Sequence, residues 1–355
     1  MKIRLVLLDK DEKYLNRLSS AFSSRDDYST EIYSFTDLEQ AMSALEKVGN
    51  CVFIASDRFD IDSKSIPESV CHAWFTENRS VLEYKGRAAI CKFQKADNIF
   101  REILSVFSGS PSEIGDNGSH TGTHSEAKVY GFFSCSGGSG ASTAAAACAL
   151  RFTSMGKKAL YLNLERFGTS SIFFRSESRT RIGDLIYAIK SKRTNLSLRL
   201  KSAVMQSEDG VFFIESCTAA PEVMEITAED IDMLLTQLKN MNGFDYIIVD
   251  SDLLLEGAPL ELMRQTTANI LVSNGEYTSN VKLERINAAM NIIAVRDEIS
   301  FPQTWLLYNR FSSKSGIAHK NIDLAVLGGA PRYEGGSSES IVSHLSQMAF
   351  FDALL

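Results

Sequence analysis

The sequence predicts two α/β domains, each built on a doubly wound parallel sheet, joined by a flexible linker. Apolar runs with the length of buried strands alternate with stretches of helical spacing, which is typical of a parallel sheet covered by helices. The alternation occurs on both sides of a segment rich in Gly, Ser and Thr. The chain has 355 residues, 44% of them hydrophobic, and is long enough for two cores. We expect domains at 1–107 and 128–355, with the linker at 108–127.

The first domain contains a series of short strands and amphipathic helices. Apolar runs predict strands at residues 3–8, 31–35, 51–55, 72–76 and 88–93. Apolar residues at helical spacing predict helices at 12–22, 37–48 and 98–107. The stretch between the last two strands is too short for a full helix, so none is expected there.

The linker is defined by its composition. Eleven of the 20 residues at 108–127 are Gly, Ser or Thr, and Ile114 is the one large apolar side chain among them. Such a segment buries too little apolar surface to offset the entropy lost on ordering, so it is typical of a flexible linker. The alternative is a long surface loop within one domain.

The second domain repeats the alternation on a larger scale. Buried strands are predicted at residues 129–134, 159–164, 211–216, 246–250, 270–273 and 304–308. An Ala-rich helix is predicted from Thr143 to about Met155, because Gly156 is well suited to end it. The loop before this helix therefore joins a strand to a helix N-terminus.

The composition indicates a soluble protein of the cytoplasm. The net charge is −7, and the six cysteines show no CxxC pair or zinc-like spacing, which fits a reducing compartment. The N-terminal apolar run is interrupted by Arg4 and Asp9 and is too short for a secretory signal. The longest charge-free stretch, 129–150, has nine Gly, Ser or Thr among its 22 residues, so we expect no integral membrane segment.

One region departs from the acidic balance. Residues 175–201 hold eight basic and two acidic side chains, a local charge of +6. Overall acidity argues against a dedicated nucleic-acid binder, although a total charge can hide a local patch. Three interpretations stay open: a solvated helical face, a surface for a protein partner, and weak non-specific DNA binding with a steep salt dependence.

The loop before the Ala-rich helix predicts a phosphate site. Its glycines allow successive backbone N–H groups to turn inward, and the helix N-terminus adds partial positive charge. Gly-rich runs also form simple turns, so the strand before the loop and the helix after it are what favour phosphate binding. The residues expected to bind the nucleotide here are Gly137, Gly138, Ser139, Gly140, Ala141, Ser142 and Thr143.

Six segments resemble, in order, the motifs of the MinD/ParA ATPases. The loop resembles their deviant Walker A sequence, Lys-Gly-Gly-x-Gly-Lys-[Ser/Thr]-Thr. The others are similar to the switch residues, the Walker B strand, the Val-Thr-x-Pro-Glu turn, the adenine-side Asn-Arg and the Gly-x-Ile-Pro turn, and lie at 163–168, 244–250, 272–276, 308–310 and 327–331. The resemblance implies ATP and Mg²⁺ as cofactors.

The same resemblance implies roles for individual residues. Ser142 and Asp250 would be ligands of Mg²⁺, the latter directly or through water. Asn309 and Arg310 would contact the nucleotide on its adenine side, and Pro331 would also bind the nucleotide.

The loop nevertheless departs from the family at both of its lysines. Ser136 stands at the signature position and Ala141 at the Walker A position. A lysine there offsets charge in phosphoryl transfer, and its loss removes a contact of roughly 1.5–3 kcal/mol. Asn163 replaces the first switch Asp, whereas Glu165 remains as the candidate catalytic residue that orients water. We expect ATP binding with slow or no turnover, at most a weak ATPase. The alternatives are an active ATPase in which Arg166 or another arginine replaces the lost charge, and a nucleotide-independent scaffold.

The first domain resembles the receiver domain of response regulators. Asp9 and Asp11 follow the first strand, where receivers hold Mg²⁺. Thr76 stands at the end of the fourth strand, and Lys92 follows the fifth.

The phospho-acceptor position of this receiver-like domain is irregular. The alignment places Ala55 or Ser56 where the family has Asp, and Asp57 comes one or two residues late. A shift of one residue reverses the side-chain direction of a strand. We therefore expect a pseudo-receiver used for docking, and the alternative is phosphorylation of Asp57.

The order of the domains, a receiver-like domain in front of a MinD/ParA-like domain, resembles that of the TadZ/CpaE proteins of tight-adherence (Flp) pilus systems. The sequence of segment 217–221 also resembles this subgroup. The resemblance implies a homodimer that binds pilus and secretion machinery and marks its assembly site, at a cell pole or the inner face of the membrane. MinD ends in a basic membrane helix, but residues 340–355 contain no Lys or Arg. We expect this tail to pack on its own domain.

Overall fold

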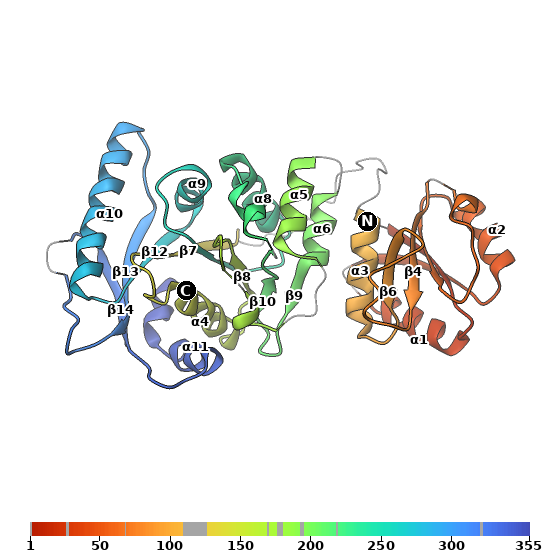
Figure 1. Ribbon diagram of the computed structural model, residues 1–355, viewed down its shortest axis with the longest axis horizontal. Helices are drawn as coiled ribbons and strands as arrows, with labels where there is room; N and C mark the ends of the chain where they lie inside the picture. The colour runs from red at the N-terminus through yellow and green to blue at the C-terminus, as the bar shows by residue number, and fades with distance from the viewer. Residues whose placement is uncertain are drawn as a thin grey trace. The chain divides into compact units, whose positions relative to one another are not determined.

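The chain forms two compact units, each built around one sheet (Figure 1). The structure is a computed structural model. It describes residues 2–25, 28–67, 69–108, 126–168, 170–175, 180–191, 195–217, 219–319 and 322–355. The first unit lies within Met1–Gly122 and also includes Ser191–Ala203, and the second comprises Thr123–Lys190 and Val204–Leu355. Most of the predicted linker, residues 109–125, lies outside the described residues.

The first unit has a six-stranded sheet in the order β2-β1-β3-β4-β6-β5. Its strands are β1 (Lys2–Leu8), β2 (Ser29–Phe35), β3 (Val52–Ser56), β4 (Cys71–Thr76), β5 (Glu83–Tyr84) and β6 (Arg87–Cys91). Its helices are α1 (Glu12–Ser23), α2 (Leu38–Val48), α3 (Ala96–Ser108) and α6 (Leu196–Ala203), with a 3-10 turn η1 (Ser63–Ser65). All neighbouring strands are parallel except β5 and β6. The predicted α/β class is confirmed.

The connection between β4 and β6 contains a hairpin, which the sequence analysis did not predict. Its length predicts only that a full helix does not fit. Strand β5 pairs antiparallel with β6 through a two-residue turn. Lys85 and Gly86 both have positive φ, +47° and +73°. Two positive φ values are typical of the type I′ turn that matches the twist of a hairpin.

The second unit has an eight-stranded sheet in the order β14-β13-β12-β7-β11-β8-β10-β9, parallel except for β9. Its strands are β7 (Lys128–Ser134), β8 (Ala159–Asn163), β9 (Val204–Gln206), β10 (Phe212–Ile214), β11 (Tyr246–Ser251), β12 (Ala268–Ser273), β13 (Gln303–Phe311) and β14 (Ala325–Pro331). Its helices are α4 (Ala141–Ser154), α5 (Ile182–Ser191), α7 (Ala220–Met224), α8 (Ala228–Asn240), α9 (Gly257–Gln265), α10 (Tyr277–Arg296) and α11 (Ser338–Ser346), with 3-10 turns η2 (Ser170–Ile172) and η3 (Ala349–Leu354).

One motif was predicted as the wrong element. Residues 327–331 are similar to a turn, but in the structure they belong to the edge strand β14, which pairs with β13. The glycines of this strand make room for a neighbour, since a Cβ at Gly328 would lie 2.6 Å from Phe350. Local sequence alone did not reveal this packing.

The helices cover both faces of the second sheet. In Figure 1, α4 and α11 lie on one face and α8, α9 and α10 on the other. The C-terminal tail packs on its own domain, as predicted: Phe351 and Leu354 are buried in the same core as α4, and Asp352 forms an ion pair with Arg151 at 2.8 Å. No helix in the described ranges has the length and apolar character needed to cross a bilayer.

Candidate nucleotide site

The predicted phosphate loop lies between the carboxyl end of β7 and the N-terminus of α4. Gly138 and Gly140 have φ of +76° and +82°, in the left-handed region that favours glycine. The backbone N–H groups of residues 140–143 have no hydrogen-bond partner within the described part of the chain. Such groups at a helix N-terminus attract anions. Backbone N–H groups that are open to a ligand thus lie within the predicted loop. The residues of this loop are Gly137, Gly138, Ser139, Gly140, Ala141, Ser142 and Thr143.

Two carboxylates lie next to this loop at the carboxyl ends of neighbouring strands. The Ser142 hydroxyl donates to Oε2 of Glu165 at 3.1 Å. Asp250, fully buried in β11, accepts a hydrogen bond from the Asn163 side chain at 2.9 Å. Burial raises the pKa of Glu165, and burial together with the charge of Glu165 raises the pKa of Asp250. Neither carboxylate has a cationic partner among the residues described.

The oxygen atoms around Asp250 fit Mg²⁺. Oδ1 of Asp250 and Oδ1 of Asn163 are buried and have no hydrogen-bond partner in the described chain. Mg²⁺ prefers oxygen ligands and, at phosphate sites, takes one or two carboxylates and completes its shell with water and phosphate. No group of three or more His, Cys, Asp and Glu residues suited to a metal occurs in the ranges that the structure describes. Ser142, Asp250 and Asn163 would hold the ion, which would neutralise phosphate charge.

Ser136 and Ala141, which stand where the resemblance implies lysines, both contact neighbouring residues. The Ser136 hydroxyl lies 2.9 Å from the Ser279 hydroxyl of α10, which lies 2.9 Å from that of Ser273. Ala141 is 4% exposed and belongs to the core under α4. Arg166, a candidate for the lost charge, instead donates to Asp252 through Nε at 2.9 Å.

The predicted nucleotide-binding residues outside the loop lie near the ends of β13 and β14. Asn309 and Arg310 donate hydrogen bonds to carbonyl groups of the phosphate loop itself. Pro331 ends the edge strand β14 opposite Phe311. Contact with the nucleotide therefore remains a prediction for Asn309, Arg310 and Pro331.

The acidic and basic receiver positions of the first unit meet each other. Nζ of Lys92 lies 2.6 Å from Oδ2 of Asp9, and both side chains are almost fully buried. Asp11 is the N-cap of α1 and accepts a hydrogen bond from the Tyr14 N–H. The Thr76 hydroxyl donates to the Asn78 carbonyl at 3.1 Å.

The acceptor region of the first unit lies at the end of β3. Ala55 and Ser56 are buried within the strand, and Asp57 follows it, half-buried, with its N–H on the Phe75 carbonyl. Burial and the nearby Glu77 raise the pKa of Asp57. The geometry leaves both docking and phosphorylation of Asp57 as proposals.

Comparisons with known proteins agree with both folds. Residues 1–108 match the model of the TadZ-like receiver domain, and no curated protein matches the sequence. The second unit is similar to the ParA family ATPase from Chlorobium tepidum TLS, with TM-score 0.51 and 16% identity over 64% of this chain and 95% of that chain. Residues 1–108 thus match a TadZ-like receiver domain, and the second unit has the fold of the ParA family ATPase.

Two MinD structures are also similar to the second unit. The cell division ATPase MinD from Pyrococcus furiosus has TM-score 0.49 and 14% identity, over 64% of this chain and 99% of that chain. The septum site-determining protein MinD from Pyrococcus horikoshii OT3, complexed with Mg-ADP, has TM-score 0.48 and 14% identity, over 62% and 94%.

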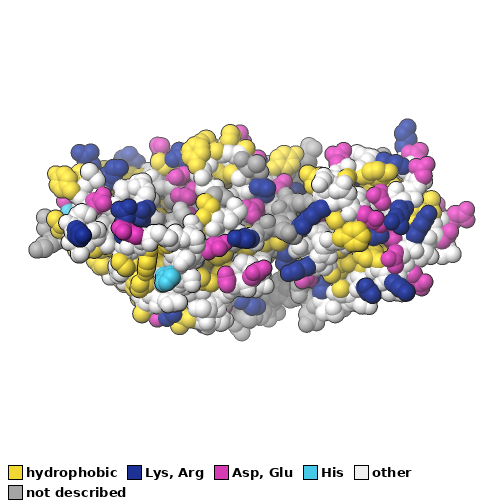
Figure 2. Space-filling view, turned by 60° about the horizontal axis from the view of Figure 1, so that its bottom comes forward, with side chains coloured by type: hydrophobic (Ala, Val, Ile, Leu, Met, Phe, Trp, Pro, Cys, Tyr) yellow, Lys and Arg dark blue, Asp and Glu magenta, His cyan; other side chains and the backbone are white. Residues whose placement is uncertain are grey.

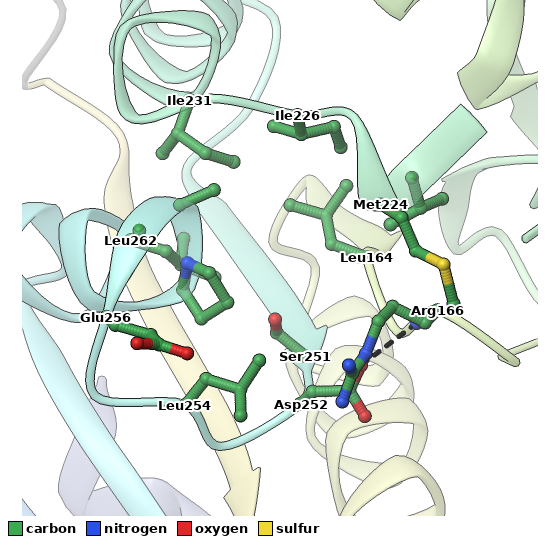
Figure 3. Close-up of a pocket in the computed structure, with 14 residues that line it drawn as sticks. Leu164, Arg166, Met224, Ile226, Ile231, Ser251, Asp252, Leu254, Glu256 and Leu262 are labelled. Carbon is green, nitrogen blue, oxygen red and sulfur yellow. Dashed lines mark hydrogen bonds and ion pairs between the residues drawn. The ribbon is translucent and has the colours of Figure 1, made fainter. Parts of the chain in front are cut away.

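A pocket opens beside the candidate nucleotide site. It has a volume of about 260 Å³. Figure 3 shows aliphatic side chains lining it, among them Leu164, Ile226 and Leu262, with the Arg166–Asp252 ion pair on one side. The pair explains why Arg166 is not directed to the phosphate loop.

The basic stretch 175–201 is only partly described, because Arg179, Lys192 and Arg193 lie outside the described residues. Several of its other charges contact the protein itself. Lys190 donates to the Glu225 carbonyl at 2.6 Å, and Lys201 lies 5.2 Å from the ring centre of Tyr28. On the face shown in Figure 2, the coloured basic and acidic side chains are interspersed.

Two residues of the site were missed by the sequence analysis. The Tyr161 hydroxyl donates to Oδ2 of Asp250 at 2.9 Å. Tyr161 stands two residues before Asn163 in β8, so the alternation of a strand places both on one face and was a usable signal. Asp252, the partner of Arg166, had no such signal.

Proposed function

We propose that the second unit binds ATP with Mg²⁺ and hydrolyses it slowly or not at all. The observation that carries this proposal is the open N–H groups of the loop beside Ser142, Glu165 and Asp250. Backbone donors and oxygen ligands are sufficient for binding. The missing lysines remove charge that stabilises the transferring phosphoryl group, so turnover suffers more than binding.

Calorimetry with Mg·ATP on nucleotide-free protein, together with a turnover assay, tests this proposal. We expect binding without appreciable turnover. Ala141→Lys should tighten ATP binding or raise the rate. Gly140→Ala is the negative control, because its φ is +82° and a Cβ there would lie 2.4 Å from Asn309. Absence of ATP binding in the natural protein contradicts the proposal, and appreciable turnover supports the active ATPase.

We infer that the first unit is a docking domain. Lys92 and Asp9 neutralise each other in the position where receivers hold metal and phosphate, which supports this role. Incubation with a small-molecule phosphodonor and Mg²⁺ should leave the protein unmodified. An acid-labile adduct that disappears in Asp57→Ala would show instead that Asp57 is a phospho-acceptor.

We propose that the chain, as a homodimer, marks the assembly site of a tight-adherence (Flp) pilus and recruits its secretion machinery at a cell pole or the inner face of the membrane. The TadZ-like receiver domain and the ParA-type fold support this. A fluorescent fusion should form foci that persist when pilus genes are deleted. A fusion that spreads over the nucleoid in a salt-sensitive way would favour DNA binding through 175–201.

A further inference from the structure

Two neighbouring residues of β13 hold three consecutive carbonyl groups of the phosphate loop. Nδ2 of Asn309 donates to the carbonyls of Ser139 and Gly140, at 3.1 and 3.0 Å. Nη1 of Arg310 donates to the carbonyl of Gly138 at 2.8 Å. The loop is thus tethered by residues about 170 positions later in the chain.

These tethers decide where the loop's N–H groups point. In a planar trans peptide, the carbonyl of one residue and the N–H of the next point in opposite directions. Because Asn309 holds the carbonyls of Ser139 and Gly140, the N–H groups of Gly140 and Ala141 are turned away from it. Neither N–H has a hydrogen-bond partner among the described residues, so both are available to an anion.

The tether is closely fitted. Asn309 is 3% exposed, and a Cβ at Gly140 would lie 2.4 Å from its Nδ2 and 3.5 Å from Cδ of Arg310. Arg310 has φ of +57°, which is uncommon for a residue with a side chain. A buried amide in such contact has little freedom to turn toward another partner.

We propose that Asn309 is a positioning residue that orients the loop's N–H groups toward the diphosphate of a nucleotide, with Arg310 as a second tether. The inference rests on the proposed nucleotide binding. Because the loop has no lysine, the direction of its backbone donors contributes a larger share of phosphate affinity. The proposal differs from an adenine contact, which would act on the base.

Comparison of ADP with AMP separates the two roles. Asn309→Ala should weaken ADP binding about tenfold and leave AMP binding unchanged, since hydrogen bonds to charged groups are the stronger ones. Asn269→Ala is the matched control. Its buried amide also donates to a backbone carbonyl, that of Met263, but Asn269 lies at the amino end of the interior strand β12, whereas the loop lies at the carboxyl ends of the strands. Equal losses for ADP and AMP, or no loss, would overturn the inference.

Hydrogen exchange without nucleotide tests the tether separately. The N–H groups of Ser139 and Ala144 donate to the carbonyls of Ser136 and Gly140, and both should exchange faster in Asn309→Ala. Arg310→Ala removes an exposed side chain and serves if Asn309→Ala fails to fold. Unchanged exchange overturns the tether. If the natural protein binds no ADP, the proposed function fails, whereas the exchange result still stands for the tether.

Discussion

Lys92 and Asp9 form an ion pair inside the first unit, with Nζ 2.6 Å from Oδ2 and side-chain exposures of 6% and 1%. Nζ of Lys92 also lies 4.9 Å from the ring centre of Tyr14. Breaking such a pair leaves one buried charge without a partner, which costs more than the pair itself contributes. Each of the two charges in the first unit therefore depends on the other for its compensation.

The first prediction concerns this pair. Lys92→Met should lower the free energy of unfolding of the first unit by roughly 3–5 kcal/mol. The double variant Asp9→Asn/Lys92→Met should recover most of the loss, because no charge remains buried. Fluorescence of Trp74 in a Trp305→Phe background reports on this unit alone, since these are the chain's two tryptophans. Equal losses in the single and double variants would contradict the prediction.

The sequence predicted what depends on local pattern. Apolar runs such as Val52–Ser56 are buried strands because a parallel sheet covered on both faces requires continuous apolar sequence. The phosphate loop followed from glycines between a strand and a helix, and the structure has left-handed backbone at Gly138 and Gly140.

Contacts between distant segments could not be predicted in this way. The tether of Asn309 to Gly140 spans 169 residues, and no local spacing reports it. Leu198 lies between α5 and β9 of the second unit in sequence but joins the core of the first. An apolar residue shows that it will be buried, not which core will bury it.

The second prediction concerns Leu198 in the core of the first unit. Leu198 is 5% exposed and packs with the buried apolar residues of α3, and Arg199 next to it donates to the Ser105 carbonyl at 3.1 Å. Leu198→Ala should destabilise the first unit by about 2 kcal/mol through lost burial and a cavity. Chemical unfolding followed at Trp74 measures it. Leu82→Ala is the control, since Leu82 is 63% exposed and should cost little.

The third prediction is a pH dependence. Burial lowers the pKa of His72 to about 4 from 6.5, and its ring stacks on Phe53 at 5.5 Å. The unfolded chain binds the proton more readily than the folded one. His72 therefore contributes stability that is fully present above pH 6.5 and is lost as the pH falls toward 4. The loss attributable to His72 is up to about 3 kcal/mol.

His72→Phe keeps a stacked ring and removes this titration. Denaturant titrations at several pH values should therefore give a flatter profile for His72→Phe than for the natural chain, again followed at Trp74. If the unfolding free energies of the two proteins change in parallel between pH 6.5 and 4, titration of His72 does not cause the pH dependence, and the prediction is contradicted.

The last prediction concerns the buried carboxylate of the candidate nucleotide site. Oδ2 of Asp250 accepts hydrogen bonds from Tyr161 and Asn163, whereas Oδ1 is buried without a partner in the described chain. If Oδ1 faces Mg²⁺, Mg²⁺ should tighten ADP binding in the natural protein by about tenfold or more, as a hydrogen-bonded, desolvated carboxylate holds a cation strongly. In Asp250→Asn the amide has no charge, so most of the effect of Mg²⁺ on ADP binding should be lost, measured against EDTA. Tyr161→Phe removes one donor but keeps the carboxylate, and should retain the Mg²⁺ effect. Calorimetric titrations of ADP under both conditions measure this, and a Mg²⁺ effect that survives in Asp250→Asn would assign the cation to other ligands.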